Sequence, residues 1–128
     1  MQLKEIRPII RTRQLPETIA FYEQLGFTCA EYNEEWGWAA FRRDKVALMA
    51  ALPLESEPFD RPVFTGSLYF LLEEGVDELW AAFAGKAEVC YAPETFPYGM
   101  REFAVFDNNG YLLQFGQPVA WNKENETF

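Results

Sequence analysis

The sequence predicts an α+β fold in which one unit, strand–helix–strand–strand–strand (βαβββ), occurs twice. The two copies are found by the order of their predicted elements rather than by sequence identity. They cover residues 1–52 and 64–118, with a linker at 53–63 and a polar tail at 119–128. At 128 residues the chain is expected to form one domain that is large enough to bury a core.

The first copy opens with a loosely alternating stretch that predicts a strand over residues 3–13. Pro16 suits the first turn of a helix, and Gly26 is placed to end that helix. Its apolar stripe is formed by Ile19, Phe21, Tyr22 and Leu25. Three more strands are expected at 27–32, 36–41 and 46–52.

The second copy repeats this order with a clearer helical signal. A strand at 66–72 precedes four apolar residues at i, i+3, i+4 and i+7, and Gly85 closes the helix. The four residues are Val76, Leu79, Trp80 and Phe83. A short strand at 87–91 and a loop at Pro93 are expected to follow.

A hairpin completes the second copy. Asn and Gly tolerate the positive φ of tight turns, so the segment 107–110 (DNNG) predicts a turn between strands at 101–106 and 111–115. Alternation places Phe103 on an apolar face and Glu102 on the opposite face. A lone hairpin is marginal in water, so the apolar face must be covered.

Composition limits the possible partners. The net charge is −9, which repels nucleic acid and anionic membranes and attracts a cation, although acidity also serves solubility. Aromatic residues make up 17% of the chain, which suggests a lined cavity or an oligomer interface. The sequence has no histidine, so Ser-His and Cys-His nucleophile systems are excluded.

Location and redox state are also suggested by the sequence. No segment reads as a signal peptide or membrane span, which favours a cytoplasmic protein. Cys29 and Cys90 belong to no CxxC pattern and are expected to be free thiols.

The segments FYEQLGF (21–27) and YGMREFAVFDNNGYLLQFGQP (98–118) resemble the vicinal-oxygen-chelate superfamily of glyoxalases, bleomycin-resistance proteins and extradiol dioxygenases. The second segment is most similar to the bleomycin-resistance branch. The resemblance implies curved mixed sheets with the helices outside, and a dimer that often exchanges halves. It covers about the whole chain.

The family's enzymes hold a divalent metal with four side chains, and the resemblance places these positions at Arg7, Met49, Ser67 and Gln114. Arg7 is a cation and Met49 is a soft ligand, so only Gln114 could ligate acceptably. One neutral ligand does not hold a divalent ion against water. We therefore expect neither a metal nor another cofactor.

A cavity without a metal is then the candidate site, and no catalytic residue is assigned. Trp36 and Trp38 either line it or cover the helices as core, and Tyr98 at the mouth of the hairpin either binds or packs. Glu102 either contacts a ligand or pairs with Arg101 or Arg7. The inner side is expected to carry Arg7, Ser67, Tyr69, Glu102, Ala104 and Gln114.

The favoured function is a metal-free protein of the bleomycin-resistance type that binds a small aromatic or cationic molecule. One alternative is a glyoxalase- or dioxygenase-like enzyme with an atypical metal or none, in which Glu102 acts as base. Another is a partner-binding module with a collapsed interior. A homodimer is expected, because three prolines stiffen the linker at 53–63 and favour reaching across to a second chain.

Overall fold

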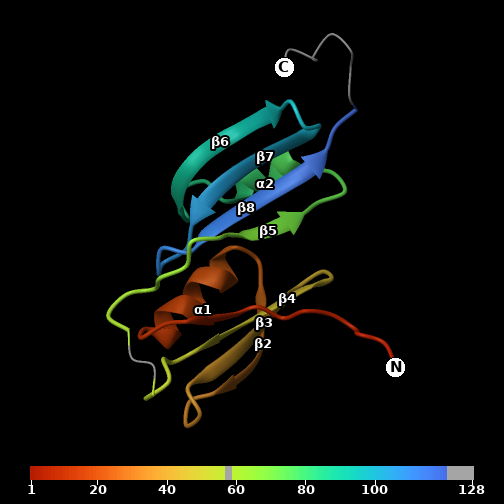
Figure 1. Cartoon of the computed structure of the whole chain (residues 1–128). Coiled ribbons are helices and arrows are strands. Elements are labelled where there is room, and N and C mark those ends of the chain that lie inside the picture. The colour runs from red at the N-terminus through yellow and green to blue at the C-terminus, as the bar shows by residue number, and fades with distance from the viewer. Residues whose placement is uncertain (57–58, 121–128) are drawn as a thin grey trace. The chain divides into compact units, whose positions relative to one another are not determined.

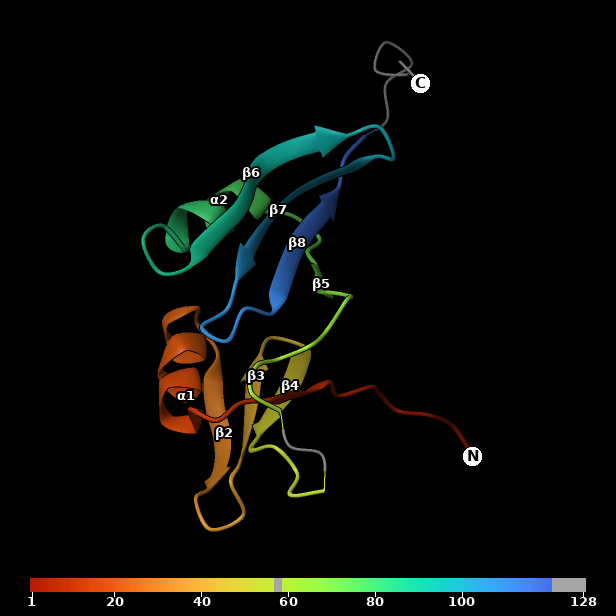
Figure 2. The ribbon, with the colours of Figure 1, turned by 60° about the vertical axis from the view of Figure 1, so that its left-hand side comes forward.

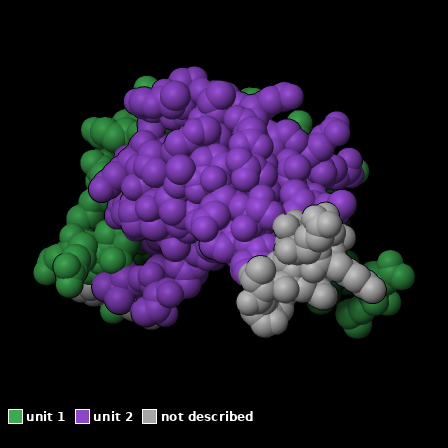
Figure 3. Space-filling view, turned by 90° about the horizontal axis from the view of Figure 1, so that it is seen from above, with its two compact units in different colours: residues 1–62 green, residues 63–128 purple. Residues whose placement is uncertain are grey.

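The computed structural model describes residues 1–56 and 59–120. The chain divides into two compact units, residues 1–62 and 63–128, which Figure 3 shows in green and purple. Two residues of the predicted linker, 57 and 58, and the predicted tail from residue 121 onward lie outside the described residues.

Unit 1 contains one helix and one four-stranded mixed sheet (Figure 1). The strand order is β1-β4-β3-β2, in which β1 runs parallel to β4 and the other pairs are antiparallel. The elements are β1 (Ile9–Arg11), α1 (Leu15–Gln24), β2 (Thr28–Asn33), β3 (Trp38–Arg43) and β4 (Val46–Ala51).

Unit 2 has the same plan, with strand order β5-β8-β7-β6 and a parallel β5–β8 pair. Its elements are β5 (Leu68–Leu71), α2 (Val76–Ala82), β6 (Glu88–Phe96), β7 (Met100–Phe106) and β8 (Leu112–Pro118). The prediction of an α+β fold built from two βαβββ units is confirmed.

Aromatic side chains form the core of unit 1 between α1 and the sheet. The ring of Tyr22, which is fully buried, lies 5.2 Å from that of Phe41 and 5.6 Å from that of Phe27. Leu25 is also buried, whereas Ile19 of the predicted stripe is only half-buried. The face of β3 that carries Phe41 is therefore the helix-covered face.

The core of unit 2 is built around Phe103. Its ring centroid lies 5.3 Å from Trp80 and 5.9 Å from Phe83, both from the α2 segment, and 5.2 Å from Phe115 of β8. The helix therefore covers one face of this sheet, as Figure 2 also shows. The opposite face, which carries Glu102, is free of α2.

Two predicted elements are wrong in their extent. The strand expected over 3–13 is limited to Ile9–Arg11, because β4 offers only Met49–Ala51 as ladder partners. The loop expected at Pro93 lies within β6, which runs from Glu88 to Phe96. Proline is tolerated there because β6 is an edge strand with register shifts between Val89 and Glu94.

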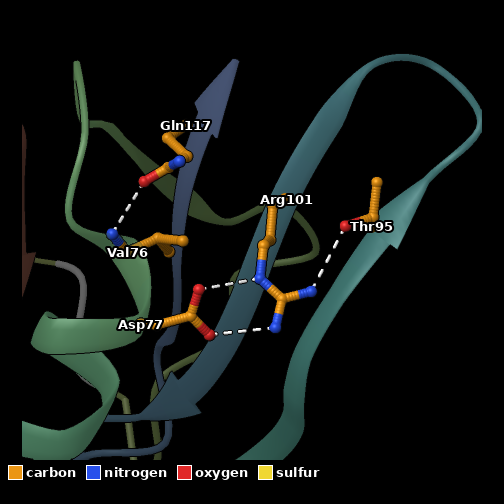
Figure 4. A network of polar contacts seen from close by, with 5 residues as sticks. All are labelled: Val76, Asp77, Thr95, Arg101 and Gln117. Carbon is orange, nitrogen blue, oxygen red and sulfur yellow. Dashed lines mark hydrogen bonds and ion pairs between the residues drawn. The ribbon is translucent and has the colours of Figure 1, made fainter. Parts of the chain in front are cut away.

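Polar contacts fix α2 to the sheet (Figure 4). The Arg101 guanidinium donates to both carboxylate oxygens of Asp77 at 2.9 Å, and also to Thr95 Oγ1 at 3.2 Å. The backbone N–H of Val76 donates to Gln117 Oε1 at 2.8 Å. The Gln117 side chain thereby satisfies one of the unpaired N–H groups with which every helix begins.

Neither helix in the described residues is long and apolar enough to cross a membrane.

Candidate functional site

Glu102 lies at the centre of the sheet face that α2 leaves uncovered. It sits on β7 directly opposite Gly116 of β8, and its residue exposure is 1%. Because side chains alternate along a strand, Glu102 points away from the core residue Phe103. The interpretation that Glu102 pairs with Arg101 is wrong, because the Arg101 guanidinium is bound to Asp77 of α2 (Figure 4).

Two tyrosines approach this carboxylate. Tyr98, in the turn between β6 and β7, donates its hydroxyl hydrogen to Glu102 Oε1. The side chain of Tyr69, on β5, lies directly against Gly116. If residue 116 carried a Cβ atom, that atom would overlap the Tyr69 hydroxyl and lie 2.7 Å from Tyr69 Cζ. Gly116 is therefore required at this position so that the Tyr69 ring can reach the carboxylate.

A second group of polar side chains surrounds Gln114 on the same face. The Ser67 hydroxyl donates to Gln114 Oε1 at 2.5 Å, and Gln114 Nε2 donates to the Tyr91 hydroxyl at 2.9 Å. The Tyr91 ring meets Phe96 edge to face at 5.9 Å, and Phe96 stacks on Tyr98 at 5.4 Å. Two polar groups, around Glu102 and Gln114, are thus joined by aromatic contacts.

We define the tyrosine–carboxylate face as the side of the β5–β8 sheet opposite α2. It brings together five residues that the sequence predicts for the site, and two that the sequence analysis missed, Tyr91 and Phe96. The aromatic residues of β6 could have indicated them, but the loop predicted at Pro93 ended the predicted strand before Phe96. The predicted members are Ser67, Tyr69, Tyr98, Glu102 and Gln114.

The environment of the tyrosines favours their neutral hydroxyl forms. Burial raises the pKa of Tyr69 from 10.0 to about 12, and the negative charge of Glu102 adds to this rise. Burial, followed by the hydrogen bond to Glu102, raises the pKa of Tyr98. The hydroxyls therefore remain hydrogen-bond donors beside a carboxylate.

Alkaline titration is expected to reveal this shift. The folded-state pKa of Tyr69 is raised, so its stabilising contribution is complete below the unfolded pKa of about 10 and is lost as pH rises through about 12. Tyrosinate absorbance should show a late step that is smaller in Tyr69→Phe, where the part that remains comes from the other tyrosines with a raised pKa, such as Tyr98. Tyr32→Phe, on an exposed tyrosine of β2, is the control and should retain the late step. A Tyr69→Phe titration identical to wild type would contradict the assignment.

The remaining predicted site residues belong to unit 1. Arg7 donates to Glu5 Oε1 at 2.8 Å, and Trp36 is 75% exposed in the turn before β3. Trp38 lies on the face of β3 opposite Phe41 and donates its indole N–H to Met49 Sδ at 3.3 Å. The interpretation that both tryptophans cover the helices as core is therefore wrong.

The four positions that the family would use for a metal do not suit a divalent ion. Ser67 and Gln114 are bonded to each other, Met49 accepts the indole N–H of Trp38, and Arg7 is a cation paired with Glu5. Within residues 1–56 and 59–120, no three His, Cys, Asp or Glu side chains gather in a way that could hold a metal. We therefore derive no chemistry through a bound metal.

Comparison with family models gives a match over residues 3–115 to the Glyoxalase/Bleomycin resistance protein/Dioxygenase superfamily. The match extends over both units and includes the residues of the tyrosine–carboxylate face. A comparison with curated protein sequences gave no match.

Solved structures share the fold at low identity. A bleomycin resistance determinant encoded on transposon Tn5 is 23% identical with a TM-score of 0.74, covering 92% of this chain and 100% of its own. A bleomycin-binding protein complexed with bleomycin is 22% identical with a TM-score of 0.73, covering 90% and 98%. A protein of unknown function from Agrobacterium tumefaciens str. C58 is 18% identical with a TM-score of 0.74, covering 93% and 97%.

Proposed function

This chain belongs to the Glyoxalase/Bleomycin resistance protein/Dioxygenase superfamily, and we propose that it is a metal-free protein that binds a small aromatic or cationic molecule. Drugs of the bleomycin type are the first candidates, because one similar structure is a bleomycin-binding protein in complex with bleomycin. The observation that carries the proposal is the buried carboxylate of Glu102 beside tyrosine rings on the face opposite α2.

The tyrosine–carboxylate face has the chemistry that a planar ligand requires. Tyr69 and Tyr98 are 44% and 64% exposed, so their rings are accessible to a ligand. An aromatic pair contributes about 0.5–1.5 kcal/mol beyond area burial, and a desolvated cation–π contact about 2 kcal/mol. Hydrogen-bonding groups at Gln114 and Glu102 would orient a ligand held by such contacts.

The proposal is tested by titrating the protein with bleomycin in a calorimeter and following the heat of binding. Saturable binding at tens of micromolar or tighter, which corresponds to about −6 kcal/mol, is the expected result. Glu78→Gln, on the exposed side of α2, is the matched control and should bind as the wild type does. No response in this concentration range would contradict binding of bleomycin-type drugs.

We also propose that the protein acts as a homodimer. Strands β1 and β5 each have one strand partner in the described chain, and exposed Ile9 and Leu71 lie on these edges. Unpaired strand edges and exposed apolar side chains favour association. Sedimentation equilibrium at micromolar concentration should give twice the 14.9 kDa chain mass, and a single 14.9 kDa species would contradict the dimer.

We further propose that the protein is located in the cytoplasm. The free thiols Cys29 and Cys90 support it, because cysteines remain reduced in that compartment.

A further inference from the structure

One oxygen of the buried Glu102 carboxylate has no hydrogen-bond partner. Oε1 accepts from Tyr98, and the Tyr69 and Tyr91 hydroxyls lie near the same carboxylate, but Oε2 is buried and no residue in the described part of the chain donates to it with hydrogen-bond geometry. Buried polar atoms nearly always have a partner, and a charged acceptor without one is unfavourable. This face of the sheet is therefore complete only when a donor reaches Oε2.

The basic side chains that the structure describes in unit 2 do not provide that donor. Within residues 63–120 these are Lys86 and Arg101. Arg101 is bound to Asp77 on the helix-covered side, and Lys86 follows α2 as an exposed residue. The negative charge of Glu102 consequently lacks a counter-charge among residues 63–120, and a ligand that brings a cation would supply one.

Tyr98, which we call the cover of the Glu102 carboxylate, lies at the surface. Tyr98 lies in the turn between β6 and β7, is 64% exposed, and is held by a hydrogen bond to Glu102 and by stacking on Phe96. Gly99, next to it, has a φ of 83°, the left-handed conformation that glycine adopts readily in turns. Tyr98 belongs to neither strand, so a rotation of its side chain towards solvent would leave the strand pairing intact.

Resting on the proposed binding function, we propose that the ligand carries a protonated nitrogen that donates a hydrogen bond to Glu102 Oε2 once Tyr98 has swung aside. The ligand class is thus an arylalkylamine, whose ring lies against the tyrosines while its ammonium group meets the carboxylate. Tyr98 holds the carboxylate in the absence of ligand and competes with binding.

Two variants should have opposite effects. Glu102→Gln removes the charge of the acceptor and should weaken amine binding about tenfold or more, since hydrogen bonds to charged groups are among the stronger ones. Tyr98→Phe removes the hydroxyl that holds the cover closed, and should strengthen amine binding several-fold. A purely structural Glu102 would not produce an increase in affinity in Tyr98→Phe.

The test is a backbone NMR titration of the whole chain with three indole probes that share a two-carbon side chain and differ in the charge of its terminal group. They are tryptamine, which is cationic, indole-3-ethanol, which is neutral, and indole-3-propionate, which is anionic. Tryptamine is expected to bind the tyrosine–carboxylate face about tenfold more tightly than the neutral probe. This comparison uses the wild-type protein, so it holds even where Glu102→Gln fails to fold.

In folded Glu102→Gln, the preference for tryptamine should vanish, whereas the control Glu78→Gln should keep it. Equal or tighter binding of the neutral or anionic probe at this face would overturn the inference while leaving the proposed binding function intact. If no probe shifts any resonance of the face, the inference fails, and failure of bleomycin to bind would separately reject the binding of bleomycin-type drugs. Weaker tryptamine binding by Tyr98→Phe would overturn the role of the cover.

Discussion

Phe103→Ala is expected to lower the free energy of unfolding of unit 2 by about 3–5 kcal/mol. Phe103 is fully buried, and its ring contacts Trp80, Phe83 and Phe115. Truncation removes buried apolar surface and leaves a cavity between α2 and the sheet. Because whole domains are stable by about 5–15 kcal/mol, this loss is a large fraction of the total.

Urea denaturation followed by circular dichroism measures the change. The matched control is Phe64→Ala, since Phe64 is exposed and has one ring contact, to Tyr111 at a centroid distance of 6.3 Å. The control is expected to lose less than about 1 kcal/mol, as surface substitutions generally do. Similar losses in both variants would show that α2 does not cover the sheet as described.

Gly116→Ala is expected to abolish ligand binding while preserving the fold. The new Cβ would overlap the Tyr69 hydroxyl and lie 3.3 Å from Glu102 Cβ, so the Tyr69 ring must move away. Tyr69 is partly exposed and can move outward. Bleomycin affinity should fall at least about tenfold, which is ~1.4 kcal/mol, and the pKa of Tyr69 should fall from about 12 towards 10.0.

Gly66→Ala is the control, because its Cβ would meet only the exposed Phe64 ring, at 3.0 Å. It should bind bleomycin as the wild type does. The double variant Gly116→Ala with Tyr69→Ala removes the clashing ring, so its loss of stability should be smaller than the sum of the two single losses. Additive losses would contradict the close approach of Tyr69 to Gly116.

The hairpin and its two faces were predictable because their determinants are local. The backbone N–H groups of Asn109 and Tyr111 donate to Asp107 Oδ1 at 2.8 and 2.9 Å, so the turn is fixed by residues adjacent in sequence. Once the turn is fixed, strand alternation places Phe103 and Glu102 on opposite faces. The register of Gln114 follows from the same turn.

The extent of β6 was not predictable in this way. A proline inside a strand is tolerated only at an edge or bulge, and sequence alone does not identify β6 as an edge strand. The register shift between Tyr91 and Glu94 also breaks simple alternation. Tyr91 and Phe96 were therefore missed, although both contribute to the candidate site.

Side-chain partners that depend on tertiary placement also could not be predicted from the sequence. Arg101 was considered a partner for its neighbour Glu102, yet it binds Asp77, which is 24 residues away along the chain. Alternation explains this after the fact, because Arg101 and Glu102 point to opposite faces of β7. The orientation of Trp38 likewise required its contact with Met49.

The central claim is that a small molecule binds on the face of the β5–β8 sheet that α2 leaves uncovered. Its most direct test is to map backbone amide shifts in isotope-labelled protein saturated with bleomycin. The largest shifts are expected on this face, at Tyr69, Tyr91, Glu102 and Gln114. Shifts confined to the α2 side, around Trp80 and Phe83, or no shifts at all, would contradict it.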